Sequence, residues 1–308
     1  MTAPSVSPLA VLSSGSLAAY WRFHRAVASA QLAAWLPAPG GLLIDISGAT
    51  AAYADQAAAR GHLVLRVIPP SDETARGQQA PGTARRRQTA PDGAPRQATR
   101  ERSVPGQRQP GRVVEVVAEP GSLEFLADDC ADGVIAEAGA LSHHLMAEDL
   151  ACEIARVLRP GGRLFACVDS LVLGMAMLAE QRRWAHLVDV PRAEVFLVPW
   201  PDGTITRCFG ASQLRDLLTE AGLDVRWVRP RTLLSPSMVD HVLRREPGAI
   251  ARLVRAELRA GQDGQPASPD ESFGISLVAA ARKSPGHDPG QDAGDGRAGR
   301  AVLSALSS

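Results

Sequence analysis

The opening part of the chain alternates between helical periodicity and short apolar runs of strand length. Over Leu17–Trp35 the apolar residues recur about every 3.6 positions, and Ser16 stands where an N-cap is expected. Leu42–Ile46 and His62–Ile68 are apolar runs of strand length, separated by the alanine-rich segment Ala51–Arg60. A strand, a tight turn, a helix and a second strand form a βαβ unit, which predicts a parallel sheet covered by helices.

The same alternation resumes after residue 111 and predicts further strands and helices. The strands are expected at Val113–Val117, Gly133–Glu137, Arg163–Asp169, Val225–Val228 and Phe273–Ala281, and the helices at Ala147–Leu158, Leu171–Leu187, Ser212–Ala221, Ser237–Arg244 and Ala249–Ala260. Seven strands with helices between the first five predict an α/β fold with a doubly wound, mostly parallel seven-stranded sheet. The last two helices predict a helical cap inserted before the final strand.

Two segments depart from this pattern and set the expected domain organisation. Residues 69–111 are rich in Arg, Gln, Pro and Gly and nearly devoid of large apolar side chains, so they cannot bury enough surface to offset the entropy of ordering. The tail, 284–308, is similarly poor in apolar residues. We expect a flexible N-terminus at 1–15, one domain at 16–283 with a disordered insertion at 69–111 and a cap at 232–262, and a disordered tail at 284–308.

The insertion includes the basic run Arg85-Arg86-Arg87. A solvated loop is the simpler interpretation, and an arm that binds RNA or phospholipid is the alternative. No aromatic side chains are interleaved with the arginines for base stacking. We therefore favour the solvated loop.

Composition and charge exclude several function classes. The 308 residues include 33 Lys+Arg and 33 Asp+Glu, whereas dedicated nucleic-acid-binding proteins usually carry a basic excess. Apolar residues reach 45%, enough for a sizeable core, while aromatics are only 4%. No apolar run approaches the roughly 18 residues of a membrane span, and no basic segment precedes the first apolar stretch. We expect neither a nucleic-acid partner nor a membrane partner.

The cysteines and the choice of basic residue indicate the cellular setting. Four cysteines lie in segments that the pattern assigns to the core, and their spacing is not that of a metal site: Cys130, Cys152, Cys167 and Cys208. So few cysteines in a long chain are expected to be reduced thiols of a cytoplasmic protein. Lys283 is the only lysine, and this preference for arginine, with abundant Ala, Gly and Pro, is typical of a GC-rich bacterial genome.

Several sequence blocks are more specific than the overall pattern. Arg156–Leu164 reads RVLRPGGRL, in which a helix ends, a proline blocks its continuation and two glycines form the corner into a buried strand. Leu123–Phe125 precedes Asp132–Ile135, in which an aspartate stands before a buried run. Cys208–Leu214 precedes a helix that ends in the block Leu217–Leu223.

With these blocks the chain resembles the class I S-adenosylmethionine-dependent methyltransferases, in particular the small-molecule branch called type 11. The resemblance covers about Leu17–Lys283, apart from the arginine-rich insertion. It implies a Rossmann-like fold, S-adenosylmethionine as the cofactor, and methyl transfer to an O, N or C nucleophile of a small molecule. Because transfer is an in-line displacement at a sulfonium, catalysis rests on positioning and desolvation and requires no nucleophilic side chain.

The resemblance also implies where the cofactor binds. In the family the first strand ends in an acid and is followed by a GxGxG turn. Asp45 stands at the acid position, Ser47, Ala49 and Ala51 stand at the glycine positions, and Gly48 falls between them. Since glycine allows open torsions and a close approach of the backbone to the ligand, these departures imply a tighter or differently shaped pocket.

Two further cofactor-binding candidates follow the second and third strands. The family usually has an acid at the end of the second strand that accepts hydrogen bonds from the ribose hydroxyls, and Ile68 stands there instead. Asp72 or Glu73 are acids that could reach back from the loop. Losing such a charged acceptor weakens binding by about 2 kcal/mol. Glu119 falls where the family commonly has an acid near the adenine amine.

His143 and His144 follow the fourth predicted strand, at the carboxyl edge where such sheets bind ligands. A loop pair that bonds to local backbone is the simpler interpretation, and a general base or orienting group on the substrate side is the alternative. We expect no metal site here, because adjacent histidines point in different directions and no Cys or acid lies at ligand spacing.

The first predicted helix carries Tyr20, Trp21 and Trp35, three of the few aromatics. They are expected to dock the helix on the core, and a lid over the cofactor and substrate is the alternative that the family suggests. Walker, GxSxG and HExxH motifs do not occur, so the nucleotide-hydrolase, esterase and zinc-protease classes have no support. Two hypotheses remain: a small-molecule methyltransferase, or a degenerate methyltransferase-fold protein that acts as a binding or scaffold module. The sequence specifies no oligomeric state.

Overall fold

The structure is a computed structural model that describes residues 18–48, 50–70, 111–119, 121–189, 195–200, 203–263 and 274–284. The segments expected to be flexible or disordered lie outside these ranges, apart from a few residues at their ends. The expectations for residues 1–15, 71–110 and 285–308 therefore stay predictions.

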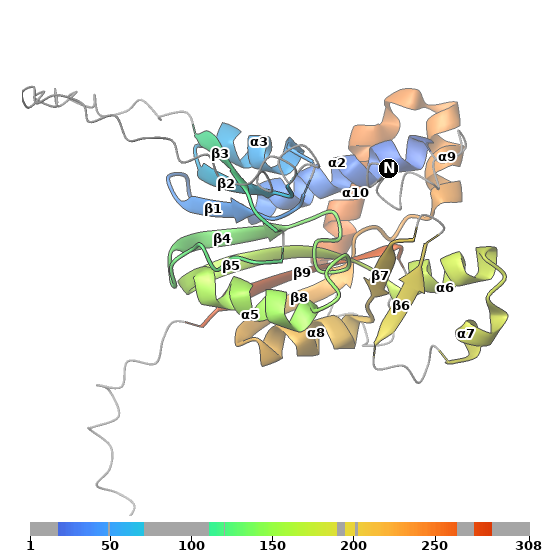
Figure 1. Ribbon diagram of the computed structural model, residues 1–308. Coiled ribbons are helices and arrows are strands. Elements are labelled where there is room, and N and C mark those ends of the chain that lie inside the picture. Colours follow the sequence, from blue (N-terminus) through green and yellow to red (C-terminus); the bar gives the residue numbers. More distant parts are fainter. Residues whose placement is uncertain are drawn as a thin grey trace, which may run out of the picture.

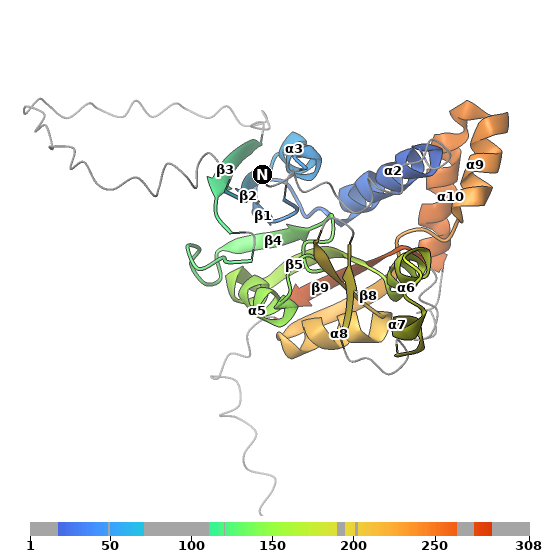
Figure 2. The ribbon, with the colours of Figure 1, turned by 45° about the vertical axis from the view of Figure 1, so that its right-hand side comes forward.

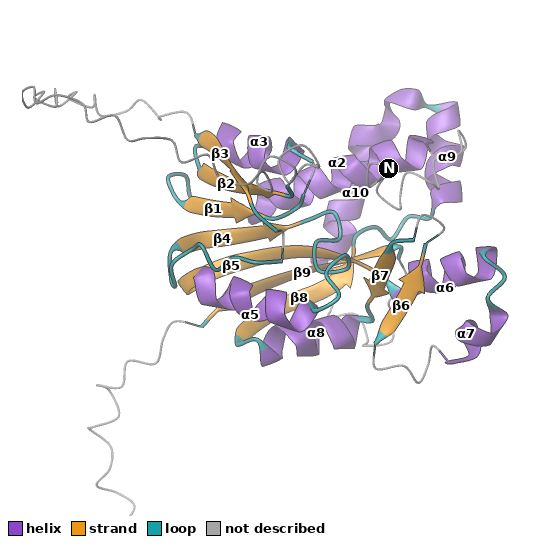
Figure 3. Ribbon diagram, in the orientation of Figure 1, coloured by secondary structure: helices purple, strands orange, loops and turns teal. Residues whose placement is uncertain are grey.

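A seven-stranded sheet forms the centre of the fold (Figure 1, Figure 3). Its strand order is β3-β2-β1-β4-β5-β9-β8, and β9 alone runs antiparallel to its neighbours. The strands are β1 (Leu42–Asp45), β2 (Leu63–Ile68), β3 (Arg112–Val117), β4 (Ala131–Ala136), β5 (Leu158–Asp169), β8 (Leu223–Pro230) and β9 (Ser276–Lys283). This topology confirms the predicted doubly wound, mostly parallel seven-stranded sheet.

Helices cover both faces of the sheet (Figure 2). Helices α2 (Ala18–Trp35) and α3 (Ala52–Ala59) pack on one face, and α5 (Ala147–Val157) and α8 (Ala211–Glu220) pack on the other. Successive residues of a strand point to opposite faces, so a strand covered on both sides must be apolar throughout. The short apolar runs in the sequence, without polar alternation, follow from this double burial.

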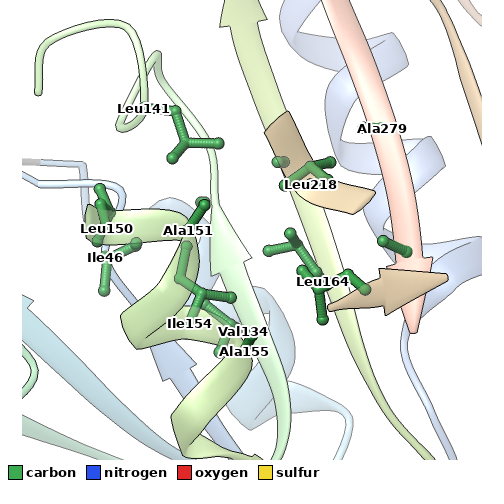
Figure 4. Packing of buried hydrophobic residues seen from close by; sticks show 14 of the residues in the cluster. Ile46, Val134, Leu141, Leu150, Ala151, Ile154, Ala155, Leu164, Leu218 and Ala279 are labelled. Atoms are coloured by element: carbon green, nitrogen blue, oxygen red, sulfur yellow. The ribbon is translucent and has the colours of Figure 1, made fainter. Parts of the chain in front are cut away.

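The larger core cluster lies between the sheet and helices α5 and α8. Figure 4 shows Ile154 of α5 beside Val134 of β4, and Leu150 of the same helix beside Ile46, which follows β1. On the opposite face, Trp35 at the end of α2 packs against Phe165 of β5 in a tilted arrangement, with ring centroids 5.4 Å apart. These contacts fix the C-terminal half of α2 on the sheet.

Two of the blocks that carried the family resemblance, Asp132–Ile135 and Arg156–Leu164, have structural roles at the amino edge of the sheet. The Asp132 carboxylate accepts the backbone N–H of Leu42 at 2.6 Å and pairs with Arg159. Gly161 has φ +80°, a backbone conformation that strains any other residue. The predicted turn at Arg159–Gly162 is assigned to the start of β5, where a register shift in the pairing of β4 with β5 accommodates the corner.

Two predicted elements differ in the structure. The single helix expected at Leu171–Leu187 is divided into α6 (Leu171–Glu180) and α7 (Trp184–Asp189), because the chain turns at Arg182 with φ +58°. A two-stranded antiparallel sheet, β6 (Phe196–Pro199) with β7 (Ile205–Cys208), was not predicted. Each strand has four residues, as β1 has, but Thr206 and Arg207 interrupt the apolar residues of β7, so no second apolar run indicates a pair of strands here.

The predicted cap corresponds to helices α9 (Pro236–Arg245) and α10 (Ile250–Asp263), joined by the 3₁₀ turn η2 (Pro247–Ala249). They pack on the N-terminal half of α2 through an apolar cluster. The Tyr20 hydroxyl bonds to the Thr232 hydroxyl at 2.9 Å. The N-terminal half of α2 therefore belongs to the cap, while its C-terminal half lies on the sheet (Figure 1).

The cysteines divide into two groups. Cys167 and Cys208 are buried in the core as expected, whereas Cys130 is half-buried and Cys152 is exposed on α5. Assigning all four to the core was therefore wrong, because Cys152 lies on the solvent side of an amphipathic helix. All four thiols are free. None of the helices in the described ranges has the length and apolar character that crossing a bilayer requires.

Candidate functional site

Three buried carboxyl side chains stand along the carboxyl edge of the sheet, one at the end of each of three neighbouring strands. Asp45 ends β1, Glu137 follows β4 and Asp169 ends β5, and these strands are neighbours. All three residues are at most 7% exposed. The sequence analysis identified Asp45 and missed the other two. The signal was available, since Glu137 and Asp169 also follow buried apolar runs directly, as Asp45 does.

Asp45 has one carboxylate oxygen engaged and one without a partner. Its Oδ1 accepts the backbone N–H of Ser47 at 2.9 Å. Its Oδ2 is buried and has no hydrogen-bond partner among the described residues. Burial raises the pKa of Asp45 to about 6, against the hydrogen bonds from Ser47 and the nearby charge of Arg66, which lower it. An acceptor in this state favours a ligand that brings a donor or a positive charge.

Ser47 ties the turn after β1 to the end of β4. Its hydroxyl oxygen accepts the backbone N–H of Glu137 at 3.0 Å. The side chain at this glycine position is therefore held by the protein itself. Ala51 is the N-cap of α3 and has helical torsions, and Ala49 lies outside the described residues.

Gly48, in the same turn, has free space where a side chain would stand. It has φ +74°, and a Cβ built on it would meet nothing within 4 Å. Its carbonyl accepts a hydrogen bond from Arg66 Nη2 at 3.2 Å, and Arg66 Nη1 pairs with Glu115 at 2.6 Å. Arg66 thus holds the turn to β2 and β3 and leaves space beside Gly48.

The two candidates beyond β1 differ in character. Ile68 ends β2 and is half-buried, and its apolar side chain offers no hydrogen-bond acceptor where the family has an acid. Glu119 follows β3 and is exposed, and its carbonyl accepts the N–H of Ser122. Asp72 and Glu73 lie outside the described residues.

Glu137 is paired with an arginine from a distant part of the sequence. Its Oε1 lies 2.5 Å from Nη2 of Arg231, which follows β8, and both side chains are at most 2% exposed. Arg231 Nη1 donates to Gln31 Oε1 at 3.2 Å, and Gln31 Nε2 donates to the Arg231 carbonyl at 3.1 Å. Because Gln31 lies on α2, this network joins that helix to the edge of the sheet.

Asp169 is the third buried carboxyl group of this edge and lies at the end of β5. Burial raises the pKa of its carboxyl to about 7. Its backbone N–H donates to the Ser142 hydroxyl at 2.8 Å, and its carbonyl accepts the N–H of Phe209. The loop after β4, the end of β5 and the end of β7 are held together at this residue.

His143 and His144 contact different glycines. The His143 backbone N–H donates to the Gly139 carbonyl at 2.9 Å, and its ring is close to Gly139. The His144 ring lies against Gly121, where a Cβ would clash with the imidazole. His144 therefore packs on the loop between β3 and β4. Within the described ranges, no group of three or more metal-ligating side chains occurs.

A family model described as a methyltransferase domain matches residues 76–166. The matched range begins after β2 and ends within β5. It therefore leaves out β1 and the turn that contains Ser47 and Gly48, the part of the chain that departs from the family pattern. A comparison with curated proteins gives no match.

The solved structures that are similar to this chain include several methyltransferases. One is an S-adenosylmethionine-dependent methyltransferase from Methanosarcina mazei, with 17% identity over 82% of this chain and 97% of that chain and a TM-score of 0.46. Another is the 1,6-didemethyltoxoflavin-N1-methyltransferase of Burkholderia thailandensis, with bound 1,6-didemethyltoxoflavin and S-adenosylhomocysteine. It has 18% identity over 92% of this chain and 93% of that chain, and a TM-score of 0.45. A third is an S-adenosylmethionine-dependent methyltransferase from Mesorhizobium loti, with 15% identity over 86% of this chain and 98% of that chain and a TM-score of 0.43.

The expected enzyme class and cofactor are supported by the matched domain, and the expected fold by the sheet topology. The match includes β3, β4, α5 and β5, which is the region of the RVLRPGGRL block. The seven-stranded, mostly parallel sheet agrees with the fold expected from the sequence. Residues 76–166 therefore match a methyltransferase domain, within a sheet of the topology that the family resemblance implied.

Proposed function

We propose that the protein transfers the methyl group of S-adenosylmethionine to a nucleophilic O, N or C atom of a small-molecule acceptor. One observation carries the proposal: Asp45, at the carboxyl end of β1, has a buried Oδ2 without a partner among the described residues, beside the open turn at Gly48. A buried acceptor without a donor is unfavourable by itself, and a ligand with an ammonium group offsets that penalty.

The residues at this edge fit the positively charged end of the cofactor better than its ribose. We assign Asp45, Gly48 and the backbone of the turn between Ser47 and Ala51 to the methionine end. Ile68 offers the ribose an apolar contact in place of a charged acceptor. Glu119, exposed after β3, remains the candidate for the adenine amine. Because the ribose lacks a charged acceptor, we expect the protein to bind S-adenosylmethionine more weakly than a site with the complete acid and glycine pattern does.

When bound at this edge, S-adenosylmethionine would supply a methyl group on a sulfonium, and the electron pair of the broken carbon–sulfur bond would leave with the sulfur as the acceptor takes the methyl group. The protein's part is to bind, orient and exclude water. The buried carboxylate of Asp45 favours a positively charged ligand, because Coulomb attraction is stronger at low dielectric. We retain His143 and His144 as candidates for a general base or an orienting group on the acceptor side.

A second candidate function is a binding or scaffold module on a degenerate methyltransferase fold. Two observations favour it: Ile68 provides no ribose acceptor, and Arg231 occupies the carboxylate of Glu137 at the same edge. In that case the edge is closed by the protein's own ion pair, and no cofactor binds.

Calorimetric titration of the full chain with S-adenosylmethionine and S-adenosylhomocysteine separates the two functions. We expect binding, weakened about tenfold by Asp45→Asn through loss of a charged acceptor. Asp55→Asn, an exposed aspartate on α3, is the matched control and should leave the affinity unchanged. Dissociation constants weaker than about 1 mM for both ligands, in a folded protein, would favour the scaffold function.

We also propose the wider setting that the sequence suggests. Residues 16–283 form one domain with an insertion at 69–111 and a cap at 232–262. The use of arginine in place of lysine and the four free thiols are in keeping with a bacterial cytoplasmic protein.

A further inference from the structure

Three buried nitrogen atoms beneath the cap have no hydrogen-bond partner among the described residues. They are Trp21 Nε1 and His24 Nε2 on α2, and Arg231 Nε after β8. Their side chains belong to residues that are 8%, 7% and 1% exposed. Buried polar groups are paired in the great majority of cases, so three together require an explanation.

These groups form one cluster at the junction of the cap and the sheet edge. The rings of Trp21 and His24 are in edge-to-face contact, with centroids 5.4 Å apart. The ring centroids of Tyr20 and His24 are 6.0 Å apart, and the Tyr20 hydroxyl bonds to Thr232, the residue after Arg231. His24 and Arg231 therefore lie in the same part of the fold, where the charge of Arg231 acts on the imidazole. Arg231 in turn bonds to Glu137, the residue after β4. The cluster thus borders the edge at which the methyl donor is assigned.

The neighbouring polar atoms on the same side chains and the same face of α2 are occupied. The Tyr20 hydroxyl bonds to Thr232. Arg231 Nη1 and Nη2 bond to Gln31 and Glu137. The fold therefore satisfies these neighbours while the three nitrogens of the cluster have no partner in the described part of the chain.

The chemistry of the three nitrogens defines the missing group. Trp21 Nε1 and Arg231 Nε can only donate, and a neutral imidazole nitrogen donates in one of its two tautomers. Burial and the charge of Arg231 lower the pKa of His24 to about 3, so the ring stays neutral. Three donors, one on a cationic group, are suited to an oxygen acceptor, and most strongly to an oxyanion.

We propose that Trp21, His24 and Arg231 bind a carboxylate or an equivalent resonance-stabilised oxyanion of the acceptor molecule. The inference rests on the proposed function, since it names the acceptor class of that site. The oxyanion anchors the acceptor under the cap, and Arg231 places it beside the end of β4. The acceptor is then an organic acid that presents its nucleophilic atom toward the turn after β1.

The test uses two probe pairs of matched shape: benzoate with benzamide, and salicylate with salicylamide. Binding to the full chain is measured by calorimetry, with and without saturating S-adenosylhomocysteine. We expect each acid to bind at least about tenfold more tightly than its amide, because charge-assisted hydrogen bonds exceed neutral ones. Trp21→Phe and His24→Phe keep the aromatic packing and remove the ring nitrogens, so both should reduce this preference.

Tyr20→Phe is the control, because it removes a hydroxyl on the same helix that already has a protein partner. It should leave the preference for acids unchanged. Equal binding of acids and amides, no binding of any probe, or a preference that survives both cluster variants would overturn the proposal. The titration with S-adenosylmethionine is read separately. A protein that binds the cofactor without preferring acids refutes the anchor alone, and one that prefers acids without binding the cofactor refutes the methyltransferase function alone.

Discussion

Glu137 Oε1 and Arg231 Nη2 lie 2.5 Å apart in a buried ion pair that joins the end of β4 to the end of β8. The two residues are 94 positions apart in the sequence. Removing both charges from water is costly, and their mutual attraction offsets that cost only while both are present. The pair therefore couples the position of the cap to the sheet edge where the cofactor is assigned.

Replacing one member of this pair should destabilise the protein strongly. Arg231→Leu leaves the Glu137 carboxylate buried without its partner, and we expect the free energy of unfolding to fall by about 3–5 kcal/mol. The double variant Arg231→Leu/Glu137→Gln should recover part of that loss. Urea denaturation measures both. Arg252→Leu breaks an exposed pair with Glu246 and should change stability by less than about 1 kcal/mol. Equal losses for the two single variants would contradict this account.

The turn at Gly48 allows backbone strain to be separated from ligand contact. Gly48 and Gly222 both have positive φ and open space where a Cβ would stand, but only Gly48 lies at the site. Alanine at either position should lower stability by about 1 kcal/mol through strain. We expect only Gly48→Ala to weaken binding of S-adenosylhomocysteine as well, by about tenfold or more. Unchanged affinity in that variant would place the ligand away from this turn.

Restoring an acid at the end of β2 should strengthen cofactor binding. Ile68→Asp introduces a carboxylate that can accept hydrogen bonds from both ribose hydroxyls, so we expect about tenfold tighter binding by calorimetry. Leu63→Asp, at the exposed start of the same strand, adds the same charge far from the edge. If both variants change the affinity equally, the effect is one of overall charge.

Asp169 should contribute a pH-dependent penalty to stability. Burial raises its pKa to about 7, above the usual 3.8, so between those values the folded state holds a proton that the unfolded state has lost. Raising the pH therefore favours unfolding across this window, and the penalty is complete above it. Asp169→Asn removes the titration. The free energy of unfolding of this variant, minus that of the natural protein, should therefore increase by about 3 kcal/mol between pH 4 and pH 7.

At each pH, the free energy of unfolding of the natural protein is subtracted from that of Asp169→Asn. Other groups, including His24 and Asp45, titrate in both and cancel in that difference. Asp224→Asn, on the exposed side of β8, is the control and should give a flat difference. A flat difference for Asp169→Asn as well would show that its carboxyl titrates normally.

The elements that bury one or two faces could be predicted from the sequence. The apolar runs of β1, β2, β4 and β5 and the periodic face of α5 are local patterns, because double burial and helical spacing act on neighbouring residues. Asp45 was identified through the family resemblance, which implies an acid at the end of the first strand. The four-residue strands β6 and β7 were missed because their pairing is what stabilises them.

The composition of the site was decided by the tertiary structure. Glu137, Arg231 and Gln31 belong to separate elements, and nothing in their local sequence indicates that they meet. Likewise, Ser47 stands at a glycine position in the sequence, and only the fold gives its hydroxyl the N–H of Glu137 to accept. The sequence by itself determined the sheet, its covering helices and the acid at the end of β1. Which polar groups are paired and which remain open depended on long-range burial, because the energy of a polar group is set by the partners that folding brings to it.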